Sequence, residues 1–152
     1  MKNLFNSSVA EIQIIYHNQV RPADMRKITK SSDAFDILRD IWSDQLEHVE
    51  EFYILLLNKA NKVLGYKLIS QGGISGTVVD PKLVFQTALK ANASSMILAH
   101  NHPSGNKLPS DADEKITQKC KSAGIFLDIT ILDHLIVTPD DNYYSFADEG
   151  KL

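Results

Sequence analysis

Apolar residues recur at helical spacing in three stretches of the chain, and each stretch follows a helix-start signal. The first helix is predicted from Ser31-Ser32-Asp33 to about Ser43. The second follows Asp80-Pro81, where aspartate suits the N-cap and proline suits the first helical position. The third begins at Ser110 and is expected to stop at Gly124. The predicted buried stripes of these helices are Ala34, Phe35, Ile37, Leu38, Ile41 and Trp42; Val84, Phe85, Ala88 and Leu89; and Ile116, Cys120 and Ala123.

Shorter apolar runs between these helices predict strands. Runs 52–57 and 62–70, which the polar residues 58–61 separate, are typical of a β-hairpin. Because strands and helices do not alternate regularly, the pattern predicts a mixed α+β sheet flanked by helices rather than a doubly wound nucleotide-binding fold. Further strands are expected at 95–99, 126–132, 134–138 and 143–146, with a short strand at 77–79 and an edge strand around Ile12, Ile14 and Tyr16.

The composition narrows the class of protein. A length of 152 residues suits one domain. The chain shows no apolar leader, and no run approaches the roughly 18 apolar residues of a membrane span. The single cysteine, Cys120, excludes an internal disulfide and thiolate zinc-finger chemistry, and a small buried hydrophobe is its ordinary interpretation. We therefore expect a cytoplasmic domain without membrane association, in which histidine and carboxylate groups bind any metal.

The charge bears on possible partners. The formal net charge is −3, whereas nucleic-acid-binding domains usually carry a strong excess of Lys and Arg for phosphate contacts. Basic residues gather at Arg21, Arg26, Lys27 and Lys30, where a solvated face is the simpler interpretation. We therefore expect no strong intrinsic nucleic-acid binding.

One segment carries a chemical signal. His100 and His102 are two positions apart at the end of a predicted strand, so both imidazoles can lie on the same face. Asp113 lies in the first turn of the next helix, and the intervening loop is long enough to bring that turn back to the histidines. Two imidazoles and a carboxylate would give zinc three protein ligands and leave a fourth position for water. Ser110-x-x-Asp113 also fits a capping box, which needs no metal.

The whole motif resembles that of a known family. His100-x-His102, seven residues and then Ser110-x-x-Asp113 is similar to the metal signature of the JAB/MPN (JAMM) metalloprotease superfamily. Three further segments resemble its RadC branch, namely Ile97-Leu98-Ala99, Asp133-His134-Leu135-Ile136-Val137 and Tyr144-Ser145-Phe146. The resemblance covers about residues 32–150. It implies a JAB/MPN-type, cytidine-deaminase-like mixed sheet flanked by helices over residues 31–152, preceded by an N-terminal extension at 1–30.

The resemblance also implies roles for individual residues. His100, His102 and Asp113 would bind Zn²⁺, although manganese, iron or nickel also suits such a ligand set. Ser110 would stabilise the oxyanion that forms when water attacks a carbonyl. A glutamate ahead of the strand at 52–57 would be the general base. Only one of the adjacent Glu50 and Glu51 can face the metal, and Glu50 fits the RadC pattern better. His134 is expected to be a hydrogen-bonding structural residue and not a ligand.

These roles predict a zinc-dependent hydrolase, namely a metallopeptidase or isopeptidase that acts on a peptide or isopeptide substrate through a zinc-activated water. Two alternatives remain: a non-hydrolytic accessory protein in DNA repair or a mobile element, and a single-metal nuclease. The RadC name carries an association with DNA repair. However, residues 1–30 lack the glycine-containing helix-hairpin-helix pattern that often accompanies the branch and binds DNA.

Overall fold

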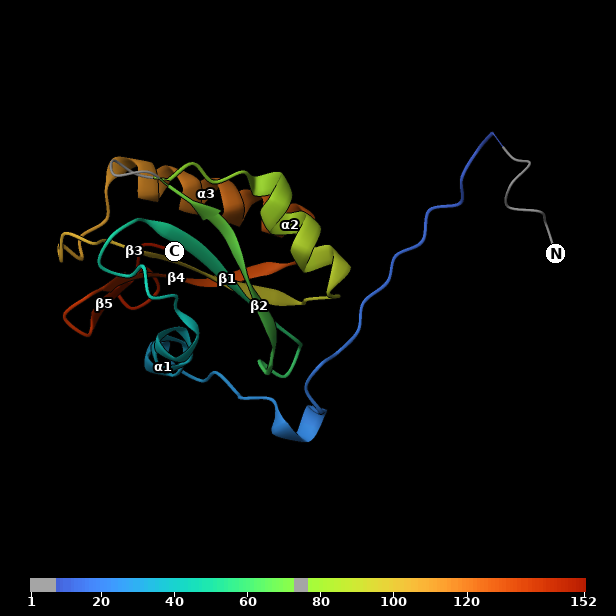
Figure 1. The fold of residues 1–152 in the computed structure, drawn as a ribbon, viewed down its shortest axis with the longest axis horizontal. Coiled ribbons are helices and arrows are strands. Elements are labelled where there is room, and N and C mark those ends of the chain that lie inside the picture. The colour runs from blue at the N-terminus through green and yellow to red at the C-terminus, as the bar shows by residue number, and fades with distance from the viewer. Residues whose placement is uncertain (1–7, 73–76) are drawn as a thin grey trace.

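A mixed sheet of five strands forms the centre of the computed structural model, which describes residues 8–72 and 77–152 (Figure 1). The strand order is β2-β1-β3-β4-β5, and all neighbours are antiparallel except β3 and β4, which are parallel. The predicted mixed α+β architecture is therefore confirmed. The strands are β1 Glu51–Leu57, β2 Val63–Gln71, β3 Ser95–Asn101, β4 Thr130–Thr138 and β5 Asn142–Ser145.

Helices cover both faces of the sheet (Figure 1). Helix α1 (Ser31–Ile41) packs on one face, and α2 (Pro81–Lys90) and α3 (Asp111–Phe126) pack on the other. Side chains of β1 alternate between the two cores: Tyr53 and Leu55 pack towards α1, whereas Phe52 and Ile54 pack towards α2 and α3. This alternation decides on which side of the sheet any residue next to β1 lies.

Amphipathic periodicity predicted the starts of the helices well. Helices α1 and α2 begin at Ser31 and Pro81, and the Asp80 side chain accepts a hydrogen bond from the Lys82 backbone N–H at 2.9 Å. Most of the predicted apolar stripes lie in the core, with Cys120 completely buried. Leu89 is an exception, since it is 51% exposed.

The prediction that the third helix stops at Gly124 is wrong. Helix α3 continues through Gly124 to Phe126, so the strand predicted from residue 126 begins only at Thr130. The two strands predicted at 126–132 and 134–138 are the single strand β4. At Gly124 a Cβ atom would lie 2.3 Å from the carbonyl oxygen of Ile129. The glycine therefore allows the backbone of Ile129 to pack closely against α3.

Two predicted short strands are not present. Residues 12–16 are irregular, with Ile12 84% and Ile14 78% exposed. Residues 77–79 are also irregular, and Val78 is 88% exposed. In both cases the local alternation lacks a neighbouring strand to complete a hydrogen-bonded ladder. No helix in the described part of the chain is long and apolar enough to span a membrane.

Candidate metal centre

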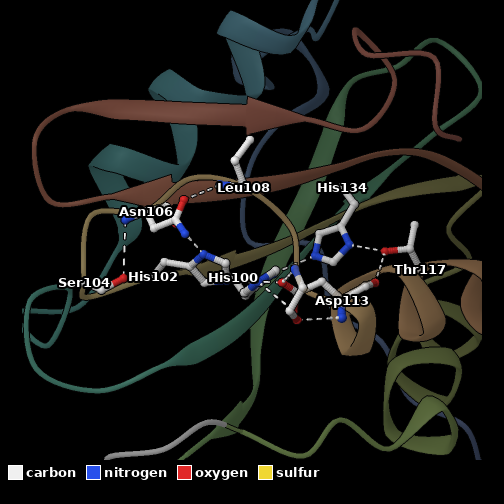
Figure 2. Close-up of polar contacts among 9 residues, drawn as sticks. His100, His102, Ser104, Asn106, Leu108, Asp113, Thr117 and His134 are labelled. Carbon is white, nitrogen blue, oxygen red and sulfur yellow. Dashed lines mark hydrogen bonds and ion pairs between the residues drawn. The ribbon is translucent and has the colours of Figure 1, made fainter.

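The predicted histidines and aspartate meet at the C-terminal end of β3 (Figure 2). His100 is the penultimate residue of β3, His102 follows the strand, and Asp113 lies in the first turn of α3. Because β3 and β4 are parallel, they need a crossover connection, and α3 forms part of it. This connection begins at the C-terminal end of β3, next to His100 and His102. The topology therefore brings the start of α3 against the end of β3.

The donor atoms of the three residues lie close together. His100 Nε2 lies 3.0 Å from His102 Nε2 and 3.1 Å from Asp113 Oδ1. His102 Nε2 lies 3.3 Å from Asp113 Oδ2, and one ligand atom from each residue lies within 4.8 Å of the others. His100 is buried, whereas His102 and Asp113 are partly accessible. The cluster thus lies at the edge of the core with one side towards solvent.

Ser110 and Asp113 also form the capping box that their spacing allows. The Ser110 hydroxyl accepts from the Asp113 backbone N–H at 3.2 Å, and Asp113 Oδ2 accepts from the Ser110 backbone N–H at 2.8 Å. Capping and clustering with the histidines are therefore compatible, because the carboxylate has two oxygens with several acceptor directions. The Ser110 side chain lies in the wall of the cleft beside the cluster.

The electrostatics of the cluster favour an ionised carboxylate. Burial acts to raise the pKa of Asp113, but the nearby His100 and His102 imidazoles outweigh burial and hold this pKa well below its usual range. For His102, burial acts to lower the pKa, while Asp113 and the Asn106 carbonyl together raise it. The Asp113 carboxylate therefore supplies a negative charge beside the imidazole nitrogens of His100 and His102.

A second set of contacts holds the histidines from behind. His102 Nδ1 lies 2.6 Å from the backbone carbonyl of Asn106. His100 Nδ1 lies 2.8 Å from His134 Nε2, and His134 Nδ1 lies 2.6 Å from the Thr117 hydroxyl (Figure 2). His134 does not belong to the metal-ligand group, and it makes hydrogen bonds as expected. Thr117 was missed in the sequence, although its position four residues after Asp113 places it on the same helix face.

The RadC-like segments after the metal motif meet beside His134. The buried Asp133 carboxylate accepts from the Ser145 hydroxyl at 2.6 Å, from the His134 backbone N–H at 2.7 Å and from the Ala147 backbone N–H at 3.0 Å. These bonds fix the backbone of β4 where His134 reaches the cluster. Asp133 thus has a structural part that its sequence context did not specify.

The structure separates the two candidate glutamates. Glu50 lines the cleft next to the cluster together with Asp113 and Val78. Glu51 is buried on the α1 side of β1, where its carboxylate accepts from the Ser43 hydroxyl at 2.7 Å. The alternation of β1 accounts for this difference, because Glu50 shares the face of Phe52 and Ile54. Whether Glu50 is the base remains a prediction.

Asn101 positions the segment that leads to Glu50, and sequence reasoning missed it. Its amide nitrogen donates to the carbonyls of Leu46 and Val49 at 2.8 and 2.9 Å. Its amide oxygen accepts from the Glu51 backbone N–H at 2.7 Å. Lying between the two cluster histidines but pointing to the opposite face, Asn101 fixes Glu50 relative to the end of β3.

The arrangement can hold a metal ion on chemical grounds. Two imidazole nitrogens and one carboxylate oxygen converge, and the carboxylate is held in its ionised form. Three such protein ligands, with the remaining coordination open, are typical of catalytic rather than structural zinc sites. The adjoining cleft has a volume of about 670 Å³, which gives a substrate access to this side of the cluster.

Comparison with known proteins establishes the family. The family model described as RadC-like JAB domain matches residues 28–151. The chain belongs to the RadC-like JAB domain family. A UPF0758 protein of Flavobacterium johnsoniae is 53% identical over 126 residues, which is 83% of this chain and 54% of the relative. UPF0758 proteins of Chlorobium chlorochromatii and Porphyromonas gingivalis are 40% and 41% identical, over 84% and 82% of this chain and 56% and 54% of the relatives.

The match covers only part of each relative. This chain spans about half the length of the curated relatives it matches. Their names specify no activity, whereas the clustered His100, His102 and Asp113 are residues that can bind a metal, as in JAB domains. Family membership and a candidate metal centre are therefore the findings on which a functional proposal rests.

Proposed function

We propose that this RadC-like JAB domain is a zinc-dependent hydrolase of the JAMM type that cleaves an amide or isopeptide bond. The observation that carries the proposal is the convergence of His100, His102 and Asp113 on one point beside an open cleft. Zinc held by these residues would supply Lewis-acid activation of a water and of the substrate carbonyl. Manganese, iron or nickel also suits such a ligand set, so the choice of zinc rests on ligand type.

In this proposal Glu50 moves the proton. Glu50 lies in the cleft wall that Asp113 also lines, which supports a role for its carboxylate in accepting a proton from the attacking water. It would then donate that proton to the leaving amine nitrogen, and one carboxylate would act first as base and then as acid. Asn101 supports this role, since its hydrogen bonds hold the segment before β1.

Ser110 has the second role in the proposal. Its hydroxyl oxygen accepts from the Asp113 backbone N–H, which leaves the hydroxyl proton available on the cleft side. That proton would be donated to the oxyanion that develops as the carbonyl is attacked. The helix cap therefore orients the same hydroxyl that would stabilise the transition state.

We propose a peptide or isopeptide as substrate rather than a nucleic acid. The net charge is −3, and Glu50, which lines the cleft and is not one of the proposed zinc ligands, is acidic, which disfavours the approach of phosphates. The cleft walls also carry Val78 and Leu108, which are 88% and 61% exposed and suit the apolar side chains of a peptide. A domain of this kind is expected to act in the cytoplasm.

Turnover of peptide and isopeptide-linked lysine libraries by the zinc-loaded protein tests this proposal. Glu50→Gln should keep zinc but lose about 10²–10⁴-fold in kcat, because the general base is removed. Glu47→Gln is the matched control, since Glu47 is an exposed glutamate of the same segment, and it should keep full activity. Equal activity of the two variants would exclude Glu50 as the base. Absence of turnover in the zinc-loaded wild type across the library would contradict the hydrolase.

A further inference from the structure

A chain of buried polar groups runs from the back of His100 into the core (Figure 2). His100 Nδ1 lies 2.8 Å from His134 Nε2, and His134 Nδ1 lies 2.6 Å from the Thr117 hydroxyl. That hydroxyl donates to the backbone carbonyl of Asp113 at 2.6 Å. Both His134 and Thr117 are completely buried, and neither takes part in the proton transfers proposed above.

The donor and acceptor of every hydrogen bond in this series can be assigned by starting from the Asp113 backbone carbonyl. The Asp113 carbonyl can only accept, so the Thr117 hydroxyl uses its one proton there. The hydroxyl oxygen must then accept from His134, which places the His134 proton on Nδ1. A neutral imidazole has only one ring N–H, so His134 Nε2 is an acceptor and must receive the Nδ1–H of His100.

The consequence reaches the metal-facing nitrogen. With its proton on Nδ1, a neutral His100 has an unprotonated Nε2, and this atom lies 3.0 Å from His102 Nε2 and 3.1 Å from Asp113 Oδ1. An unprotonated Nε2 is what a metal ligand requires. Through two successive hydrogen bonds, the Thr117 hydroxyl therefore favours the His100 tautomer whose Nε2 can bind a metal.

The rings around His134 keep it in this position. Phe146 stacks on the imidazole with a centroid distance of 4.9 Å and an interplanar angle of 12°. Phe52 contacts it edge-on at 5.5 Å. Enclosed between these rings, His134 cannot turn to solvent to satisfy its nitrogens, so its hydrogen-bond partners must be Thr117 and His100.

We propose that Thr117 and His134 are positioning residues that fix the tautomer of His100 and so keep its Nε2 available to the metal. This inference rests on the proposed zinc site. Groups behind metal-bound histidines usually are carboxylates or backbone carbonyls, and their loss typically costs 10–100-fold in metal affinity. Here the group is a second imidazole, and a hydroxyl of α3 sets its direction. Helix α3 thus supplies both the Asp113 ligand and, one turn later, the residue that orients His100.

The variant Thr117→Val tests the hydrogen-bond series from Thr117 to His100, because it removes the hydroxyl while changing the side-chain shape little. It leaves His134 Nδ1–H without an acceptor, so His134 gains by moving the proton to Nε2 and towards His100. We expect zinc affinity, measured by competition with a chromophoric chelator, to fall about 10–100-fold. Thr117→Ser restores the hydroxyl and should restore most of the affinity.

Thr87→Val is the matched control. The Thr87 hydroxyl donates to the Leu83 carbonyl one turn earlier in α2 at 2.8 Å, which is the same helical hydrogen bond without a histidine behind it. Its removal should leave zinc affinity unchanged. If Thr117→Val binds zinc as tightly as Thr117→Ser, the proposal is overturned.

The tautomers can also be measured in the zinc-loaded wild type, which requires no variant to fold. Long-range ¹H–¹⁵N NMR spectra of the imidazoles should show the protons of His100 and His134 on Nδ1. A His134 protonated at Nε2 instead would overturn the proposal. A wild type that binds zinc with these tautomers but hydrolyses nothing would contradict only the hydrolase, whereas a wild type that binds no zinc would contradict both proposals.

Discussion

At the scale of single residues, Asp113 shows how local structure and chemistry share one side chain. Its Oδ2 accepts from the Ser110 backbone N–H and lies 3.3 Å from His102, while its Oδ1 lies 3.1 Å from His100. The helix cap thus limits the rotation of the Asp113 carboxylate and keeps it in contact with His100 and His102. Replacing Ser110 is therefore expected to affect both the stability of α3 and the placement of Asp113.

Cys120 gives a prediction at the same scale. Burial raises the pKa of its thiol to about 11, so at pH 8 almost no thiolate is present in the folded protein. We expect the native protein to resist a thiol-specific reagent such as DTNB at pH 8, and to react fully once guanidinium unfolds it. A native protein that reacts as fast as the unfolded one would contradict the buried position of Cys120 on α3.

The site residues differ in how far the sequence predicts them. His100, His102 and Asp113 lie within one short segment, so spacing alone suggested that they meet, and the structure places them together. Thr117 and Asn101 act through contacts with other elements, and such contacts are not encoded in local spacing. They become visible only when β3, β4 and the segment before β1 are placed side by side.

At the scale of elements, the alternation of β1 distributes functions between two faces of the sheet. Residues in the Phe52 register face α2 and α3, and Glu50 continues that register into the cleft. Residues in the Tyr53 register face α1, and Glu51 continues that one into a bond with Ser43. A shift of one position in this strand would exchange the two glutamates.

The packing of α3 against the start of β4 gives the prediction for this scale. Gly124→Ala would place a Cβ atom 2.3 Å from the Ile129 carbonyl oxygen, so helix or strand must move. We expect the free energy of unfolding in urea to fall by about 1–3 kcal/mol. The control is Gly65→Ala in β2, where a Cβ atom would have no neighbour within 4 Å and stability should change by less than about 0.5 kcal/mol. Equal stability of the two variants would contradict the close approach.

Element prediction succeeded where the element is buried in the core. The apolar stripes of α1 and α2 follow directly from their periodicity, whereas the β1–β2 hairpin follows from its two apolar runs, of which β1 is buried along its whole length. The alternation at Ile12 and Ile14 has the period of a strand, yet no neighbouring strand pairs with it, so periodicity alone was misleading. Gly124 was misread for a related reason, since the sequence does not reveal that Ile129 returns against it.

At the scale of the whole molecule, the candidate metal centre joins the sheet to the helical layer. Its ligands come from the end of β3 and the start of α3, and the crossover between them leads on to β4. An ion bound there would link these elements only in the folded state, so it should stabilise the domain. This expectation does not depend on any substrate.

Thermal unfolding with and without zinc measures that link. At free zinc about 100-fold above Kd, mass action adds about 2.7 kcal/mol. For a domain of this size, that corresponds to a rise in Tm of about 5–10 °C relative to protein treated with EDTA. Asp113→Asn should abolish the rise. A rise of the same size in Asp113→Asn would place the stabilising ion elsewhere.

The most direct test of the account is the number of zinc ions bound per chain, measured by equilibrium dialysis and elemental analysis. The account predicts one ion per chain in the wild type and almost none in His102→Ala. His17→Ala is the control, because it removes an exposed histidine outside the cluster, and it should keep the ion. One zinc per chain in His102→Ala, or none in the wild type, would contradict the central claim that His100, His102 and Asp113 form a metal site.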